Sequence, residues 1–222
     1  MIIEISNLNK SFKEKQVFDN FSITLDDTKI NCIIGASGGG KSTLLNIIAG
    51  LLKEDSGEIK GACKSEISYI FQEDRLVPWL TIRENIELFI FNYYEKAKAY
   101  EIMERMFKLL NLENIIDKYP KNLRGGMKQR INIARALIKP SKIILMDEPF
   151  KSLDYKTKYT IMKELKGILK KENRMVIFVT HDVDEAICME GRIFVLGGSP
   201  FSVKGIFEEN LEENKEKIIE II

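Results

Sequence analysis

The fold of this 222-residue chain follows from one stretch, Gly35-Ala36-Ser37-Gly38-Gly39-Gly40-Lys41-Ser42-Thr43. It matches the pattern G-x-x-x-x-G-K-[ST], in which glycines let successive backbone N–H groups turn inward around a phosphate. We expect Lys41 to supply charge to the β- and γ-phosphates of a nucleotide and the Ser42 hydroxyl to ligate Mg²⁺. An apolar run at 29–34 precedes this loop and a helical apolar pattern at 42–52 follows it, as a phosphate-binding loop requires.

Strand-like and helix-like segments alternate outward from this loop. Strands are predicted from apolar or alternating runs at 2–5, 16–25, 67–71, 142–146 and 175–179. Helices are predicted at 126–137, where Lys139-Pro140 ends the pattern, and around the apolar stripe at 161–169. This alternation predicts an α/β fold with a mostly parallel sheet covered by helices.

The periodicity changes between Thr81 and about Asn114. Thr81 with Glu84 three residues later is typical of a capping box that opens a helix. A second helix is predicted from apolar residues at helical spacing, Ile102, Met106, Leu109 and Leu110. We interpret this stretch as an inserted helical subdomain that closes near Pro120.

Two carboxylates follow the apolar strand that begins at Ile143. Asp147 at the strand end is a candidate for the Mg²⁺ shell, and Glu148 is a candidate to polarise or deprotonate the attacking water. Two acids at a strand end would by themselves indicate only solvated side chains. The phosphate-binding loop in the same chain favours the functional interpretation.

His181 is the only histidine of the chain and directly follows a predicted strand. A lone histidine usually has a structural role, but this position suits a sensor of the γ-phosphate. An imidazole can bridge a phosphate and a catalytic carboxylate by hydrogen bonds without being the base itself.

The composition limits the classes of function. The formal net charge is +1, from 34 basic and 33 acidic residues, which argues against nucleic acid as the main partner. The apolar start of the chain is broken by Glu4, and no uninterrupted apolar run reaches the roughly 20 residues of a membrane span. We therefore expect a soluble, cytoplasmic protein.

Six motifs in order resemble the ATPases of the ABC (ATP-binding cassette) transporter family over nearly the whole chain. Besides the phosphate-binding loop and the Asp147-Glu148 pair, Asn122 to Arg130 resembles the signature motif with its helix. The remaining resemblances are Phe71-Gln72 to the Q-loop, Ser152-Leu153-Asp154 to the D-loop, and Thr180-His181-Asp182 to the switch histidine.

The resemblance implies a fold and a set of site residues. The fold is a P-loop NTPase with a RecA-like core and an N-terminal antiparallel β-subdomain at 1–78 and 121–222, and a helical subdomain at about 79–120. ATP and Mg²⁺ are the implied cofactors. The implied catalytic residues are Glu148, His181, Lys41 and Gln72. ATP is bound by residues 35–43 and by Phe12, which stacks on adenine, and the metal by Ser42, Gln72 and Asp147. The partner chain's ATP is contacted by the signature residues Leu123, Arg124, Gly125, Gly126 and Met127.

The resemblance also implies partners. Two copies, or two paired cassettes, pack head to tail around ATP, and ATP binding closes this dimer. Gln72 links the nucleotide to the helical subdomain, which receives helices from polytopic permease subunits at the inner face of the cell membrane. The segment 71–85 further resembles importers of nitrate, sulfonate and taurine, or of thiamine precursors, which use an extracytoplasmic solute-binding protein. Export rather than import remains an alternative direction of transport.

One position departs from the family. Arg124 stands where the signature has a serine whose hydroxyl donates to the γ-phosphate across the dimer. An arginine either reaches the phosphate itself or leaves the contact unmade, and we expect impaired turnover because the site has little room. Arg124 thus leaves a catalytically impaired regulatory cassette as one alternative, and an ABC ATPase with a task outside transport is a second, separate alternative. A milder departure is Lys151-Ser152, in place of small residues.

Overall fold

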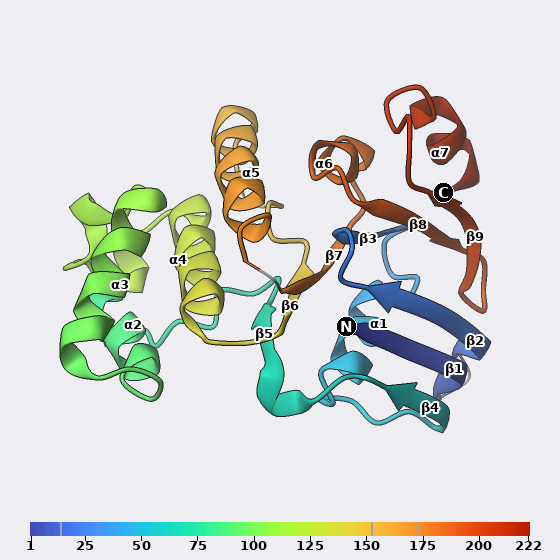
Figure 1. The fold of residues 1–222 in the computed structure, drawn as a ribbon, viewed down its shortest axis with the longest axis horizontal. Coiled ribbons are helices and arrows are strands. Elements are labelled where there is room, and N and C mark those ends of the chain that lie inside the picture. The colour runs from blue at the N-terminus through green and yellow to red at the C-terminus, as the bar shows by residue number, and fades with distance from the viewer. Residues whose placement is uncertain (14, 152, 173) are drawn as a thin grey trace.

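The computed structural model describes residues 1–13, 15–151, 153–172 and 174–222. Its centre is a six-stranded sheet in the order β5-β6-β7-β3-β8-β9 (Figure 1). These strands are β3 (Asn31–Ile34), β5 (Ile67–Ile70), β6 (Ile143–Asp147), β7 (Met175–Thr180), β8 (Arg192–Gly197) and β9 (Ser202–Phe207). Neighbouring strands are parallel except β9, which runs antiparallel to β8. The predicted α/β fold with a mostly parallel sheet is confirmed.

This sheet separates two apolar cores. In β6, Ile144 and Met146 belong to one core, whereas Ile143 and Leu145 belong to the other. Successive side chains of a strand point to opposite faces, so a strand that is buried on both faces has a continuous apolar sequence. This explains why the middle strands lack the alternation of a half-exposed strand.

Helices cover both faces of the sheet. The core on one face includes side chains of α1 (Lys41–Ile48). The core on the other face includes side chains of several helices, among them α4 (Gly125–Ile138), α5 (Tyr155–Leu169), α6 (Val183–Cys188) and α7 (Lys215–Ile221). Figure 1 shows α4 and α1 on opposite sides of the view, with the central strands between them.

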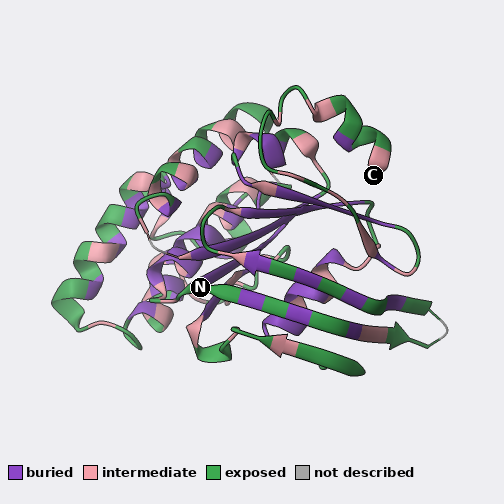
Figure 2. Cartoon of the chain, turned by 45° about the vertical axis from the view of Figure 1, so that its right-hand side comes forward, coloured by how far each residue is buried: buried purple, intermediate pink, exposed green. Residues whose placement is uncertain are grey.

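A second sheet has three antiparallel strands in the order β2-β1-β4, which confirms the predicted β-subdomain. They are β1 (Ile2–Phe12), β2 (Lys15–Asp26) and β4 (Ser56–Lys60). Ile3 pairs with Leu25 and both are buried, whereas the next pair, Glu4 with Thr24, is exposed. The alternating bands along these strands in Figure 2 show that one face packs on the core and one faces solvent.

The predicted helical segment forms α2 (Ile82–Ile90) and α3 (Lys96–Leu109), which both pack on α4. The predicted capping box is present, because the Glu84 amide donates to Thr81 Oγ1 and the Thr81 amide donates to Glu84 Oε2. Short 3-10 turns are found at Lys64–Glu66, Glu113–Ile115 and Pro120–Asn122. The boundaries of the helical subdomain at about 79–120 stay a prediction.

None of the helices that the structure describes combines the length and the apolar composition needed to cross a bilayer.

Candidate active site

The phosphate-binding loop lies between the buried strand β3 and the start of α1. Gly38 and Gly40 adopt φ values of 75° and 124°, which L side chains rarely adopt. Gly39 is required for a different reason, because a Cβ there would lie 2.2 Å from the Phe201 ring. The glycines therefore combine a turn that only glycine adopts easily with close packing against the segment before β9.

Lys41 is buried within this loop. Its ammonium donates to the carbonyl oxygens of Gly35 at 2.7 Å and Ala36 at 2.9 Å. Burial lowers the pKa of Lys41, and the negative charges of Glu148 and Asp147 oppose that effect. The amine is thus held where the N-terminus of α1 adds positive potential, an arrangement that suits polyphosphate.

Asp147 ends β6 with only 6% of its surface exposed. Burial raises the pKa of its carboxyl group, and a hydrogen bond from the Ser42 hydroxyl opposes the shift. Its Oδ1 atom is buried without a hydrogen-bond partner among the described residues. A buried carboxylate with an unused oxygen beside a hydroxyl fits Mg²⁺, which prefers oxygen ligands.

Glu148 follows in the left-handed backbone region, with φ of 45°, and its amide donates to the Val179 carbonyl. Its Oε1 lies 3.0 Å from His181 Nδ1, and its Oε2 lies 2.8 Å from the Lys151 ammonium. Although burial acts the other way, these two neighbours lower the pKa of Glu148. The carboxylate is therefore held ionised, in the state that can accept a proton or orient water.

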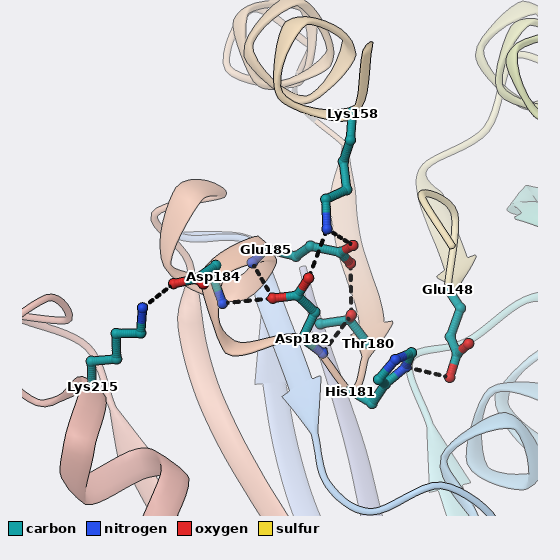
Figure 3. Close-up of polar contacts among 8 residues, drawn as sticks. All are labelled: Glu148, Lys158, Thr180, His181, Asp182, Asp184, Glu185 and Lys215. Atoms are coloured by element: carbon teal, nitrogen blue, oxygen red, sulfur yellow. Dashed lines mark hydrogen bonds and ion pairs between the residues drawn. The ribbon is translucent and has the colours of Figure 1, made fainter. Parts of the chain in front are cut away.

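His181 lies directly after β7, and its side chain is 46% exposed. Figure 3 shows the imidazole beside Glu148, while Thr180 and Asp182 on either side of it belong to a separate polar network. The structure thus brings Glu148 and His181 into contact although they are 33 residues apart in the chain.

The other predicted residues occupy separate places. Gln72 is exposed just after β5, and Phe12 is half-exposed at the end of β1, where the Lys10 ammonium lies 5.5 Å from its ring centre. Asp154 caps α5 by accepting from the Thr157 amide at 3.1 Å.

The signature and the D-loop lie in different parts of the structure. Leu123 is buried, and Arg124 to Met127 form the start of α4, on the opposite side of the view from α1 in Figure 1. In the D-loop, Leu153 packs partly against the core, and Ser152 lies outside the described residues. The structure therefore does not bring the signature to the Lys41 site of the same chain.

Two lysines beside the site are not among the residues predicted from the sequence. Lys151 was noted only as an unusual residue, yet it pairs with Glu148 three positions earlier, a spacing that suggests contact in a turn. Lys158 was not singled out, yet it contacts both Asp182 and Glu185 beyond His181. Sequence separations of 24 and 27 residues leave no local signal for those two contacts.

A cavity of about 270 Å³ lies beside the Gln72 segment, between β5, α2 and α4. Cationic side chains stack on aromatic rings at this cavity. The Arg75 guanidinium lies 3.6 Å from the centre of the Phe71 ring, and that of Arg135 lies 4.8 Å from the centre of the Phe89 ring.

Comparison with known proteins agrees with this geometry. The family model described as ABC transporter matches residues 18–151. The aliphatic sulfonates import ATP-binding protein SsuB of Bacillus cereus is 38% identical over 99% of this chain and 91% of that protein. The uncharacterized ABC transporter ATP-binding protein MJ0412 of Methanocaldococcus jannaschii is 36% identical over 97% of this chain and 85% of that protein.

Among solved structures, the chain resembles the ATP-binding cassette MJ0796 in a dimeric post-hydrolysis state bound to ADP and Pi. The TM-score is 0.83 with 31% identity, over 93% of this chain and 98% of that one. These matches span the loop, the Asp147-Glu148 pair and the overall fold described above. The chain therefore belongs to the ABC transporter family, as an ATP-binding cassette that hydrolyses ATP.

Proposed function

We propose that this cassette drives an importer of a small solute, either a sulfonate, taurine or nitrate, or a thiamine precursor. The 38% identity to a protein named for aliphatic sulfonate import supports the sulfonate class. The observation that carries the hydrolytic part is the contact of Glu148 with His181, at the end of the strand beside Lys41.

Each residue of the site has a role in this proposal. Lys41 exchanges the carbonyls of Gly35 and Ala36 for the β- and γ-phosphates of ATP. Ser42, Asp147 and Gln72 would hold Mg²⁺, which would supply positive charge to neutralise the phosphates. Phe12 stacks on adenine.

Glu148 and His181 carry the hydrolytic step. Glu148 orients and deprotonates the attacking water, because its carboxylate is held ionised and lies next to the metal ligand Asp147. His181 holds Glu148 through Nδ1 and donates from its other side to the γ-phosphate.

A head-to-tail dimer completes the site in this proposal. The signature residues 123–127 lie on α4, away from α1, so a second copy is needed to bring a signature against the nucleotide of the first. Each ATP then forms part of the interface, so binding favours the closed dimer and hydrolysis loosens it. The related cassette MJ0796 has been solved as a dimer.

Permease subunits would dock where the cavity between β5, α2 and α4 opens beside the Gln72 segment. Trp79 lies in the same segment and is 75% exposed, a large apolar surface suited to an interface. Docking there places the cassette on the cytoplasmic face of the membrane. Gln72 would report the state of the nucleotide to this surface.

The test is to tag the chain in its native cell, solubilise the membranes gently and identify co-purifying proteins by mass spectrometry. A polytopic permease together with an extracytoplasmic binding protein is the expected result, and ligand binding by that protein then identifies the solute. A permease without a binding protein would favour export. Recovery of only soluble or nucleic-acid-associated partners would refute transport.

A further inference from the structure

A partly buried ion-pair network joins the helix α5 to the residues that follow β7. The Lys158 ammonium contacts Asp182 Oδ2 at 2.7 Å and Glu185 Oε1 at 3.0 Å (Figure 3). The side chains of Lys158 and Glu185 are 15% and 5% exposed. Although burial opposes the charge, hydrogen bonds from Lys158 to Asp182 and Glu185 raise its pKa. Removing one partner of such a pair leaves the other as an uncompensated buried charge.

The network holds the residues on both sides of His181. Thr180 Oγ1 donates to Glu185 Oε2 at 2.7 Å and accepts from the Asp182 amide at 3.0 Å. Asp182 Oδ1 accepts from the Asp184 amide and so caps α6. Lys158 therefore reaches Asp182 directly and Thr180 through Glu185, as Figure 3 shows.

The His181 ring itself has little support. It is nearly half exposed, and the hydrogen bond recorded for it in the described structure joins Nδ1 to Glu148 Oε1. The position of the imidazole therefore depends on the backbone at 180–182. A shift of about 1 Å in a reacting group can slow an enzyme about 100-fold, so this support matters for rate.

We propose that Lys158 is a positioning residue for ATP hydrolysis, which holds the backbone on both sides of His181 and so sets where its imidazole meets Glu148. This inference rests on the roles proposed above for His181 and Glu148. Lys158 also lies one helical turn after Asp154, whose carbonyl accepts from the Lys158 amide at 2.8 Å. The first turn of α5 thus connects Asp154 of the D-loop to Lys158, whose side chain contacts Asp182 next to His181.

The test compares Lys158→Met with Lys158→Arg and with Lys163→Met in the full chain. Methionine keeps the length of the side chain without the charge, arginine keeps the charge, and Lys163 is exposed on the same helix. We expect Lys158→Met to lower kcat about tenfold, because His181 is less well placed. Affinity for a fluorescent ATP analogue with Mg²⁺ should change less than about twofold, since Lys158 touches no predicted ATP ligand. Arginine should restore most of kcat, and Lys163→Met should match the wild type.

A double-mutant cycle with His181→Ala separates positioning from a general structural role. If Lys158 acts through His181, then Lys158→Met in the His181→Ala background should change the single-turnover rate less than about twofold. Thr180→Val removes the other end of the network and should lower kcat in the same way, which keeps the test valid if Lys158→Met does not fold.

Three results would overturn the inference. One is an equal further loss of rate in the His181→Ala background, and another is a loss of ATP affinity that matches the loss of kcat. A third is wild-type kcat in Lys158→Met, which would leave the proposed ATPase function intact. Absence of hydrolysis by the wild type would instead remove the proposed function and this inference with it.

Discussion

Replacing Arg124 by serine should stabilise the cassette and raise its turnover. Arg124 is the N-cap residue of α4, with extended backbone angles, and its side chain makes no capping hydrogen bond. A guanidinium has no acceptor atom, so it cannot satisfy the free N–H groups of the first turn. It also places a positive charge at the positive end of the helix dipole.

The magnitude follows from these two defects. A serine cap adds about 1 kcal/mol, and removal of an exposed cation from a helix N-terminus adds about 0.3–1 kcal/mol at low salt. The expected gain is therefore about 1–2 kcal/mol in the free energy of unfolding. Each kcal/mol moves the Tm of a chain this long by about 2–4 °C, so Tm should rise by roughly 2–8 °C.

Calorimetric unfolding of the wild type, Arg124→Ser and Arg124→Ala measures this gain. Alanine removes the charge but offers no acceptor, so its Tm should rise less than half as far as that of the serine variant. Equal Tm values for all three proteins would show that neither the cap nor the dipole matters at this position. A serine variant less stable than the wild type would refute the reasoning outright.

Turnover is the second readout for Arg124→Ser. The family resemblance gives this serine a hydrogen bond to the γ-phosphate across the dimer, and a hydrogen bond to a charged group contributes about 1.5–3 kcal/mol. The steady-state ATPase rate of the assembled transporter should therefore rise by about tenfold or more. An unchanged rate would dismiss the expectation of impaired turnover, and with it the argument for a regulatory cassette.

Three further perturbations test the site and its supports. Glu148→Gln should lower kcat by about 100-fold or more, while binding of the ATP analogue is retained, because the amide cannot accept the proton of water. Asn85→Ala should cost about 2–3 kcal/mol in urea unfolding, because Asn85 Oδ1 accepts from the Val77 amide at 2.8 Å and its amide group donates to three nearby carbonyls. Acid should weaken the fold through Asp26, because a hydrogen bond from the Thr28 hydroxyl lowers its pKa from 3.8 to about 2. A carboxyl group whose pKa is lower in the folded protein stabilises the fold at pH values above its pKa in the unfolded chain. This contribution is therefore lost as the pH falls from about 4 to about 2. Asp26→Asn should flatten the dependence of stability on pH in that range.

Each of these three predictions has a result that contradicts it. Wild-type kcat in Glu148→Gln would assign the base to another group. An Asn85→Ala midpoint equal to that of the wild type would mean that water replaces the lost hydrogen bonds. For Asp26→Asn, a curve parallel to that of the wild type from pH 5 to pH 2 would show that other carboxylates carry the acid sensitivity.

The amino-acid sequence alone determined the family, the phosphate-binding loop, the Asp147-Glu148 pair and the capping box of α2. These features are local, because each depends on residue types within a few positions of one another. The same holds for most helices and strands of the core, whose apolar periodicity is visible in the chain. Strand β4 escaped prediction because its residues are largely exposed and show no clear period, and α6 because six residues are too few to show one.

Only the tertiary structure decided which distant groups meet. The order of the parallel strands places β6 beside β7, and this pairing brings Glu148 at the end of one to His181 at the end of the other. The contacts of Lys158 with the loop after β7 likewise depend on how α5 packs against the sheet. Such contacts depend on how whole apolar faces of strands and helices become buried. The same local sequence pattern is compatible with several orders of the strands in the sheet, so it does not specify these contacts. The local sequence therefore encodes the parts of the site, and long-range packing sets their geometry.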